Sequence, residues 1–247
     1  MGHQTTLLLP PPLAELAAQA PVALFLDFDG TLVPIASEPD AIEVAPGLPA
    51  TLEELSHLLS GRLALVSGRS LDDLAKHIGD PAIFRAGSHG AARQTPEGTW
   101  LGEPPQPIPS TAMTAIQGFA AQQDMHFEPK SHGAALHFRA RPDLADLAAQ
   151  FARQLAEDHG LQVKQGKAVV ELVQPGVGKD GAVRTFMEQQ TFAGSMPIFV
   201  GDDVTDEDGF LAAAGFGGFG IAVGERISSN ARYHLENVKD VHEWLKL

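Results

Sequence analysis

The 247-residue chain contains no cysteine, which excludes disulfide bonds, thiolate metal sites and cysteine nucleophiles. Any metal ion must therefore be held by oxygen atoms or by imidazole. A basic excess is also missing, because the formal net charge is −14. Proteins that bind nucleic acid usually carry a basic face, so this balance argues against a nucleic-acid partner. A small anionic substrate would also be repelled unless its site is locally positive.

Long apolar runs and targeting signals are absent as well. No stretch approaches the roughly 20 apolar residues of a membrane span. The first residues lack the basic region of a signal peptide, and their short apolar run leads straight into three prolines, residues 10–12. We therefore expect a soluble, cytoplasmic protein without a membrane partner. No pattern encodes the oligomeric state, and a monomer is the starting expectation.

Strand-like and helix-like segments alternate at both ends of the chain, which is typical of a parallel sheet with crossover helices. Strands are expected at 22–26, 62–66, 82–86, 197–200 and 219–223, and helices at 46–59, 71–78, 179–190 and 205–214. Ser70 is placed to cap the helix that follows it. These segments predict an α/β fold with a Rossmann-like parallel sheet.

A proline-rich run at 103–109 interrupts this rhythm, since it can continue neither a helix nor a sheet. A helix followed by two strands then occurs twice, which predicts a small antiparallel sheet with helices on one face. Pro175 and Gly176 close this stretch. We therefore expect a discontinuous core, residues 1–104 and 176–247, with an inserted domain at 105–175.

Two carboxylates, Asp27 and Asp29, stand at the end of the buried strand 22–26. Ligands of α/β proteins bind outside the carboxyl ends of the strands. Side chains at i and i+2 of an extended segment share one face, so both carboxylates would present oxygens to the same small volume. A positive group is expected between them. The alternative is a plain acidic turn after a strand.

A second acidic cluster, 202–208, follows the apolar strand that ends at Val200 and Gly201. Carboxylate oxygens without a thiol favour Mg²⁺, which takes few protein carboxylates. Asp27 and Asp202 are the first expected ligands, with Asp29 contributing its backbone carbonyl. Glu207 and Asp208 also suit a solvated helix start, where the helix dipole favours acidic residues.

Two further polar residues stand at the ends of predicted elements: Lys179 at the start of a helix and Ser67 at the end of a strand. Lys179 opens a helix after the insertion, from which a cation can counter the carboxylates and hold a phosphoryl oxygen. Ser67 ends a strand, and its hydroxyl can bond a phosphoryl oxygen or serve a turn. His126, His132 and His137 lack the helical spacing of a zinc site and are expected to be structural or substrate contacts.

Taken in order, these motifs resemble the haloacid dehalogenase superfamily of phosphotransferases. The four motifs are Asp27-Phe28-Asp29-Gly30-Thr31, Ser67, Lys179 and Gly201-Asp202-Asp203. The resemblance runs from Val22 to the end of the chain. It implies that the insertion between the second and third motifs is an α/β cap of the second type, which selects the substrate.

Within that superfamily, the chain resembles the trehalose-6-phosphate phosphatases. The similar segments are 87–91, 128–130 with 134–139, 170–179 and 201–207. One departure is Asp180, because the family usually has glycine directly after the lysine. The resemblance implies a Mg²⁺-dependent phosphoric monoester hydrolase that acts on trehalose 6-phosphate.

The resemblance also implies residue roles. Asp27 would attack phosphorus and form an aspartyl-phosphate, and Asp29 would act as general acid and then as general base. Thr31, Ser67 and Lys179 would hold the phosphoryl group. Asp203 and Asp206 would act from behind the metal ligands, orienting Asp202, Lys179 or a water on the metal.

Polar groups for the sugar hydroxyls are expected from both domains. The candidates are Lys130, His132 and Glu171 from the cap, with Arg69 and His89 from the core. Two other functions remain open: a phosphatase of the same chemistry for sucrose 6-phosphate or mannosyl-3-phosphoglycerate, and a non-enzymatic regulator that binds a phosphosugar.

Overall fold

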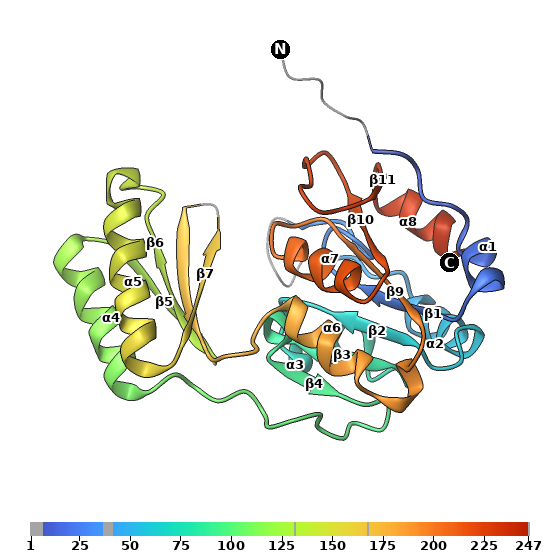
Figure 1. Cartoon of the computed structure of the whole chain (residues 1–247), viewed down its shortest axis with the longest axis horizontal. Coiled ribbons are helices and arrows are strands. Elements are labelled where there is room, and N and C mark those ends of the chain that lie inside the picture. The colour runs from blue at the N-terminus through green and yellow to red at the C-terminus, as the bar shows by residue number, and fades with distance from the viewer. Residues whose placement is uncertain (1–6, 37–41, 131, 167, 247) are drawn as a thin grey trace, which may run out of the picture. The chain divides into compact units, whose positions relative to one another are not determined.

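The computed structural model describes residues 7–36, 42–130, 132–166 and 168–246 (Figure 1). The chain divides into two compact units. One comprises Met1–Gly102 and Gly178–Leu247, and the other Glu103–Val177. The first six residues of the expected core lie outside the described residues.

A seven-stranded sheet in the order β11-β10-β9-β1-β2-β3-β4 forms the first unit. The strands are β1 (Val22–Leu26), β2 (Leu63–Val66), β3 (Phe84–Gly87), β4 (Ala92–Gln94), β9 (Met196–Gly201), β10 (Phe219–Val223) and β11 (Tyr233–Leu235). All neighbouring strands are parallel except β3 and β4. Leu26 at the end of β1 pairs with Leu65 on one side and Val200 on the other, which aligns the three strand ends.

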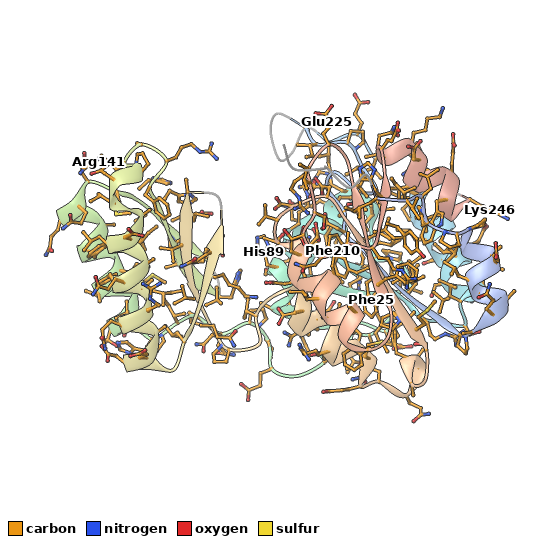
Figure 2. The ribbon with its side chains drawn as sticks, turned by 45° about the horizontal axis from the view of Figure 1, so that its top comes forward. Phe25, His89, Arg141, Phe210, Glu225 and Lys246 are labelled. Carbon is orange, nitrogen blue, oxygen red and sulfur yellow. The ribbon has the colours of Figure 1, made fainter. Side chains whose placement is uncertain are left out.

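Helices cover both faces of this sheet, because successive side chains of each strand point to opposite faces. Leu24 and Leu26 pack in one apolar cluster with α1 (Leu13–Gln19), α2 (Leu48–Leu58), α3 (Leu71–Ile78) and α8 (Val238–Leu245). Phe25 packs in the other cluster with α6 (Lys179–Met187) and α7 (Asp206–Gly215). Phe25 and Phe210 both lie in the interior (Figure 2). A strand buried on both faces explains the continuous apolar run 22–26.

The second unit is a four-stranded antiparallel sheet in the order β5-β6-β8-β7. Its elements are α4 (Ser110–Gln123), β5 (His126–Lys130), β6 (Gly133–His137), α5 (Ala145–His159), β7 (Gln162–Gly166) and β8 (Val169–Val173). Leu136 and Leu172 face the two helices in one apolar cluster. The alternate residues of the same strands, which include Glu171 and His137, point to the opposite face. This unit therefore has one apolar and one polar sheet face.

The predicted α/β class with a mostly parallel central sheet is confirmed, and so are most of its elements. The predicted boundaries of α3 and β10 agree with the structure, and the Ser70 hydroxyl caps α3 by accepting the Asp73 N–H at 3.1 Å. α6 ends at Met187, before the predicted end. α1, β11 and α8 were not predicted. Among the described residues, every helix is too short or too polar to cross a membrane.

Candidate active site

The candidate site lies at the carboxyl ends of the three central strands of the first unit. β1 is paired with β9 and with β2, so the residues that follow these strands meet at one edge of the sheet. Asp27 follows β1, Asp202 follows β9 and Ser67 follows β2. From β1 the chain adds β2 and β3 on one side, and from β9 it adds β10 and β11 on the other, so the strand order reverses between β1 and β9, where α/β sheets bind ligands.

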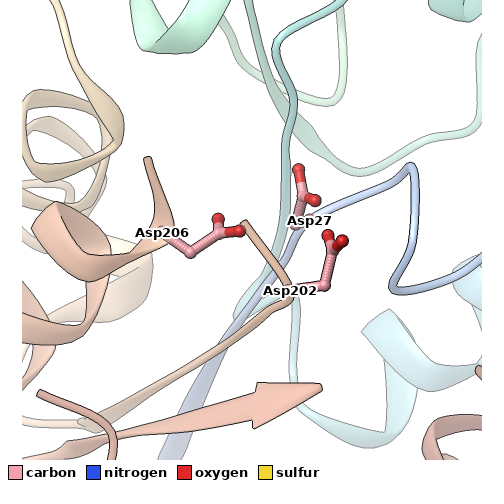
Figure 3. Close-up of side chains that lie close together, drawn as sticks. All are labelled: Asp27, Asp202 and Asp206. Atoms are coloured by element: carbon pink, nitrogen blue, oxygen red, sulfur yellow. The ribbon is translucent and has the colours of Figure 1, made fainter. Parts of the chain in front are cut away.

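Three carboxyl groups gather at this edge, those of Asp27, Asp202 and Asp206 (Figure 3). Each offers an oxygen within 4.8 Å of the others. Asp206 is the first residue of α7 and is fully buried. The resemblance implies that Asp206 acts from behind the metal ligands, and in the structure its carboxylate lies beside those of Asp27 and Asp202.

Lys179 bridges two of these carboxylates. Its Nζ donates to Asp27 Oδ1 at 2.7 Å and to Asp206 Oδ1 at 2.5 Å. It is the first residue of α6, and its side chain is 3% exposed. Burial opposes the charge of Lys179, but Asp206 and Asp27 outweigh burial and raise its pKa above the ordinary value. The side chain is therefore a permanent cation within the cluster.

One ammonium cannot neutralise three carboxylates, which leaves an excess of two negative charges when all are ionised. Burial raises the pKa of Asp202 to about 6; Asp206 adds to the rise and Lys179 opposes it. Burial likewise raises the pKa of Asp27 to about 6, against the opposing effect of Lys179. Both shifts mean that the ionised carboxylates are disfavoured in this surrounding, and a further cation would stabilise them.

The cluster fits a metal ion. Oδ1 of Asp202 is buried and has no hydrogen-bond partner among the described residues. A Cβ at Gly30 would lie 2.2 Å from Asp202 Oδ2, and Gly30 has a φ of +78°. Glycine is therefore needed there both for the turn and for the room that the carboxylate occupies. A buried, unpartnered carboxylate oxygen beside two other carboxylates matches the oxygen ligands of hard cations.

Asp29 has a different environment from Asp27. Its Oδ2 and Oδ1 accept hydrogen bonds from Arg69 Nε and Nη2, both at 2.7 Å. Arg69 Nη1 also donates to Asp73 at 2.7 Å. The carboxylate of Asp29 thus lies outside the cluster of three, while the ligand atom expected from this residue is its backbone carbonyl. Arg69, expected at the sugar, contacts two core carboxylates.

Two hydroxyl groups expected at the phosphoryl group are buried in the same unit. Oγ1 of Thr31 has no hydrogen-bond partner within the described ranges. Oγ of Ser67 accepts the backbone N–H of Arg69 at 3.1 Å, and its own hydrogen remains available for another acceptor. Both residues are 0% exposed. A buried hydroxyl with unused hydrogen-bonding capacity is a suitable donor for a bound oxyanion.

His89 belongs to a strained turn, η2 (Ser88–Gly90), that supports the segment after β2. Ser88 and His89 have φ values of +52° and +55°, in the left-handed region that non-glycine residues rarely adopt. The N–H of His89 donates to the Ser67 carbonyl at 3.0 Å. A Cβ at Gly68 would come within 2.8 Å of the His89 ring. The turn therefore braces the backbone that carries Ser67.

The polar sheet face of the second unit carries the other expected sugar contacts. Lys130 Nζ donates to Glu171 Oε1 at 2.5 Å, and His137 Nε2 lies 2.8 Å from Glu128 Oε2. His132 is buried; burial lowers its pKa, nearby Lys130 adds to this effect, and Glu171 opposes it. The structure thus brings Lys130 and Glu171 together as an ion pair within this unit.

Asp203 and Arg226 both make hydrogen bonds with other residues of the acidic loop 202–208. Asp203 is exposed; its N–H donates to Asp206 Oδ2 at 2.8 Å, and its carboxylate accepts the Thr205 hydroxyl at 3.4 Å.

The sequence did not predict the position of Arg226, whose Nε donates to the Asp202 carbonyl at 2.9 Å. Its only signal is its position just after β10, and that signal is useful only once β10 is known to neighbour β9.

The chain is similar to known phosphatases along most of its length. The family model described as trehalose-phosphatase matches residues 25–238. A probable trehalose-phosphate phosphatase of Sinorhizobium fredii is 38% identical over 222 residues, which cover 84% of this chain and 80% of the relative. Trehalose-6-phosphate phosphatase of Escherichia coli is 35% identical, over 94% of this chain and 88% of the relative. The solved structure of Aspergillus fumigatus trehalose-6-phosphate phosphatase is 26% identical with a TM-score of 0.76, and covers 98% of this chain and 97% of its own. The chain therefore belongs to the trehalose-phosphatase family.

Proposed function

We propose that this protein hydrolyses trehalose 6-phosphate to trehalose and phosphate, with Mg²⁺ as the metal. The observation that carries the proposal is the buried Asp27 carboxylate, which Lys179 holds at the end of β1 beside Asp202 and Asp206. We assign the catalytic core to residues 1–104 and 176–247 and the substrate-selecting cap to 105–175. The named relatives support the substrate.

The proposed reaction proceeds through an aspartyl-phosphate. Asp27 attacks phosphorus, and the bond from phosphorus to the sugar oxygen breaks as Asp29 gives that oxygen a proton. Asp29 then takes a proton from the water that attacks phosphorus, which releases phosphate and restores Asp27. Bound Mg²⁺, held by Asp27, Asp202 and the carbonyl of Asp29, would supply neutralisation of the negative oxygens. Asp206 and Asp203 would orient Lys179 and Asp202.

Three of the buried polar groups would hold the phosphoryl oxygens during both steps. Lys179 supplies a fixed positive charge, and Thr31 and Ser67 supply hydroxyl donors. Donors that are already in place do not have to reorganise when charge builds up on phosphorus, so they stabilise the transition state more than the ground state. Bound Mg²⁺ would balance the two negative charges that Lys179 leaves uncompensated among Asp27, Asp202 and Asp206, which would lower the repulsion of an anionic substrate at the site.

A substrate panel tests the proposal. Phosphate release with Mg²⁺ is measured from trehalose 6-phosphate, sucrose 6-phosphate, glucose 6-phosphate and mannosyl-3-phosphoglycerate, with Asp27→Asn as the blank. We expect a strong preference for trehalose 6-phosphate. Preference for another phosphate ester would support the proposed phosphatase reaction but contradict trehalose 6-phosphate as the substrate. Release from none, together with binding of a phosphosugar, would favour the regulator instead.

Lys130→Ala tests the proposed cap contacts. Losing one charged hydrogen bond to a sugar hydroxyl should raise KM for trehalose 6-phosphate about 10-fold, with a smaller change in kcat. Arg141→Ala is the matched control, because it removes an exposed cation of the same unit that pairs with Asp143. Equal KM values in the parent and Lys130→Ala, or an equal rise in the control, would contradict a sugar contact at Lys130.

Mg²⁺ binding should release protons at pH 6 but not at pH 8. Asp27 and Asp202, each with a pKa raised to about 6 by burial, are partly protonated at pH 6 in the metal-free protein, and metal binding must displace those protons. At pH 8 both groups are already ionised, so affinity should rise between pH 6 and pH 8. Calorimetry in two buffers of different ionisation enthalpy measures the proton count. Equal affinity at both pH values without proton release would contradict the assignment of Asp27 and Asp202 as ligands.

A further inference from the structure

The loop after β10 contains a cation that touches the backbone of the metal-ligand loop. Arg226 Nε donates to the carbonyl of Asp202 at 2.9 Å. β10 is the direct neighbour of β9, so the loops that follow these two strands leave the sheet side by side (Figure 1). The contact is therefore made within the first unit, at the same strand edge as the carboxylate cluster. None of the roles assigned above uses Arg226.

Glu207 holds Arg226 in this position. Arg226 Nη1 lies 2.7 Å from Glu207 Oε1, and the two side chains are 26% and 14% exposed. Glu207 Oε2 also accepts the backbone N–H and the side-chain amide of Asn230, both at 2.9 Å. One carboxylate on the first turn of α7 thus fixes both the guanidinium and the loop that carries it. A multiply bonded, partly buried pair is better ordered than a single surface ion pair.

The acidic loop is consequently held from two sides. On the inner side, Asp206 accepts the N–H of Asp203 at 2.8 Å. On the other side, Arg226 Nε donates to the carbonyl oxygen of Asp202. This carbonyl belongs to the same peptide group as the Asp203 N–H. This peptide plane is thereby fixed at both its oxygen and its nitrogen. Asp202 Cα belongs to this peptide plane, so the point from which the side chain extends toward Gly30 and the cluster is fixed as well.

We infer that Arg226, clamped by Glu207, is a positioning residue that orients Asp202 for metal binding. The inference rests on the proposed metal function of Asp202. An arginine suits this role because its rigid fork serves the carbonyl through Nε and Glu207 through Nη1 at the same time. A lysine has a single nitrogen and cannot make both contacts with that geometry. Groups behind metal ligands commonly change metal affinity about 10- to 100-fold when removed.

The test measures Mg²⁺ binding directly by calorimetry in the full-length protein, together with the Mg²⁺ dependence of phosphate release. Arg226→Ala should raise the Kd for Mg²⁺ about 10-fold. At saturating Mg²⁺, kcat should return close to that of the parent, because Arg226 does not touch the reacting groups. Lys239→Ala is the matched control, since it removes an exposed cation, 82% accessible, that pairs with Glu243. We expect no change in that variant.

Three further variants keep the test informative if Arg226→Ala folds poorly. Arg226→Lys retains the charge and should still bind Mg²⁺ several-fold more weakly, because the fork is lost. Glu207→Gln should weaken binding in the same direction, and the Arg226→Ala/Glu207→Gln double variant should be no weaker than Arg226→Ala, because the two residues act as one unit. Unfolding midpoints without metal record any purely structural effect.

Three results would overturn the inference: an unchanged Kd in the Arg226 variants, an equal loss in Lys239→Ala, or lower unfolding midpoints with intact Mg²⁺ affinity. Absence of Mg²⁺ binding in the parent would overturn the proposed metal itself, and the inference with it. That outcome is distinguishable, because it is seen before any variant is compared.

Discussion

Asp27→Asn should abolish turnover, lowering kcat by roughly 10⁴-fold or more, the scale on which loss of a covalent nucleophile acts. The amide has the shape of the carboxylate but cannot attack phosphorus, so no aspartyl-phosphate forms.

The same variant should keep the fold, because Lys179 retains Asp206 as its partner, at 2.5 Å. It should be at least as stable as the parent, because it removes one ionised group whose pKa burial has raised to about 6. Phosphate release and trapping of the phosphoenzyme measure the first effect, and the unfolding midpoint at pH 8 measures the second.

The control for this experiment is Asp72→Asn, at an exposed position in the first turn of α3. It makes the same chemical change away from the candidate site, so its kcat should match the parent. A residual kcat within 10-fold of the parent in Asp27→Asn, or a trapped phosphoenzyme in that variant, would rule out Asp27 as the nucleophile.

Lys179→Met should cause both a large loss of stability and a loss of activity. The ammonium is buried between Asp27 and Asp206, and removing it leaves two buried carboxylates without their cation. Breaking a buried pair in this way typically costs about 3–5 kcal/mol of unfolding free energy. Methionine retains the apolar length of the side chain, so the loss reports on charge rather than on a cavity.

The stability loss in Lys179→Met should depend on pH in a definite direction. Burial raises the folded-state pKa of Asp27 above its value of 3.8 in the unfolded chain, and loss of Lys179 removes the effect that opposes this rise. The folded state then binds more protons than the unfolded state above pH 4, so stability falls as pH rises through that window. Denaturant unfolding at pH 5 and pH 8 should therefore show the larger deficit at pH 8.

Two companion variants separate charge from packing in this prediction. Lys76→Met changes an exposed lysine on α3 and should alter stability by less than about 0.5 kcal/mol. Lys179→Met combined with Asp206→Asn should recover part of the lost stability, because one unpaired charge is gone, while activity stays lost. Equal stability of Lys179→Met and the parent at pH 8 would show that Lys179 does not neutralise the cluster.

Most elements of the fold could be predicted because they are long or strongly patterned. The run 22–26 is apolar throughout since both faces of β1 are covered, and α3 has a capping serine and apolar residues at helical spacing. The missed elements are short. α1 has seven residues and β11 has three, so neither would be stable alone. β11 exists through its pairing with β10, a tertiary contact. α8 did carry a signal, the Asn237 cap followed by Val238, Val241 and Leu245.

The sequence by itself determined the chemistry of this protein: carboxylates directly after apolar strands, a lysine that opens a later helix, no thiol, and the order of motifs that identifies the family. Only the tertiary structure decided which groups touch. In it, the Asp206 carboxylate lies beside those of Asp27 and Asp202. The Asp29 carboxylate accepts hydrogen bonds from Arg69, and the Asp202 carbonyl accepts one from Arg226. The physical reason is that spacing along a strand or helix specifies which face a side chain occupies. Contacts between distant segments depend instead on strand order and on how each helix is rotated against the sheet, which local periodicity does not encode.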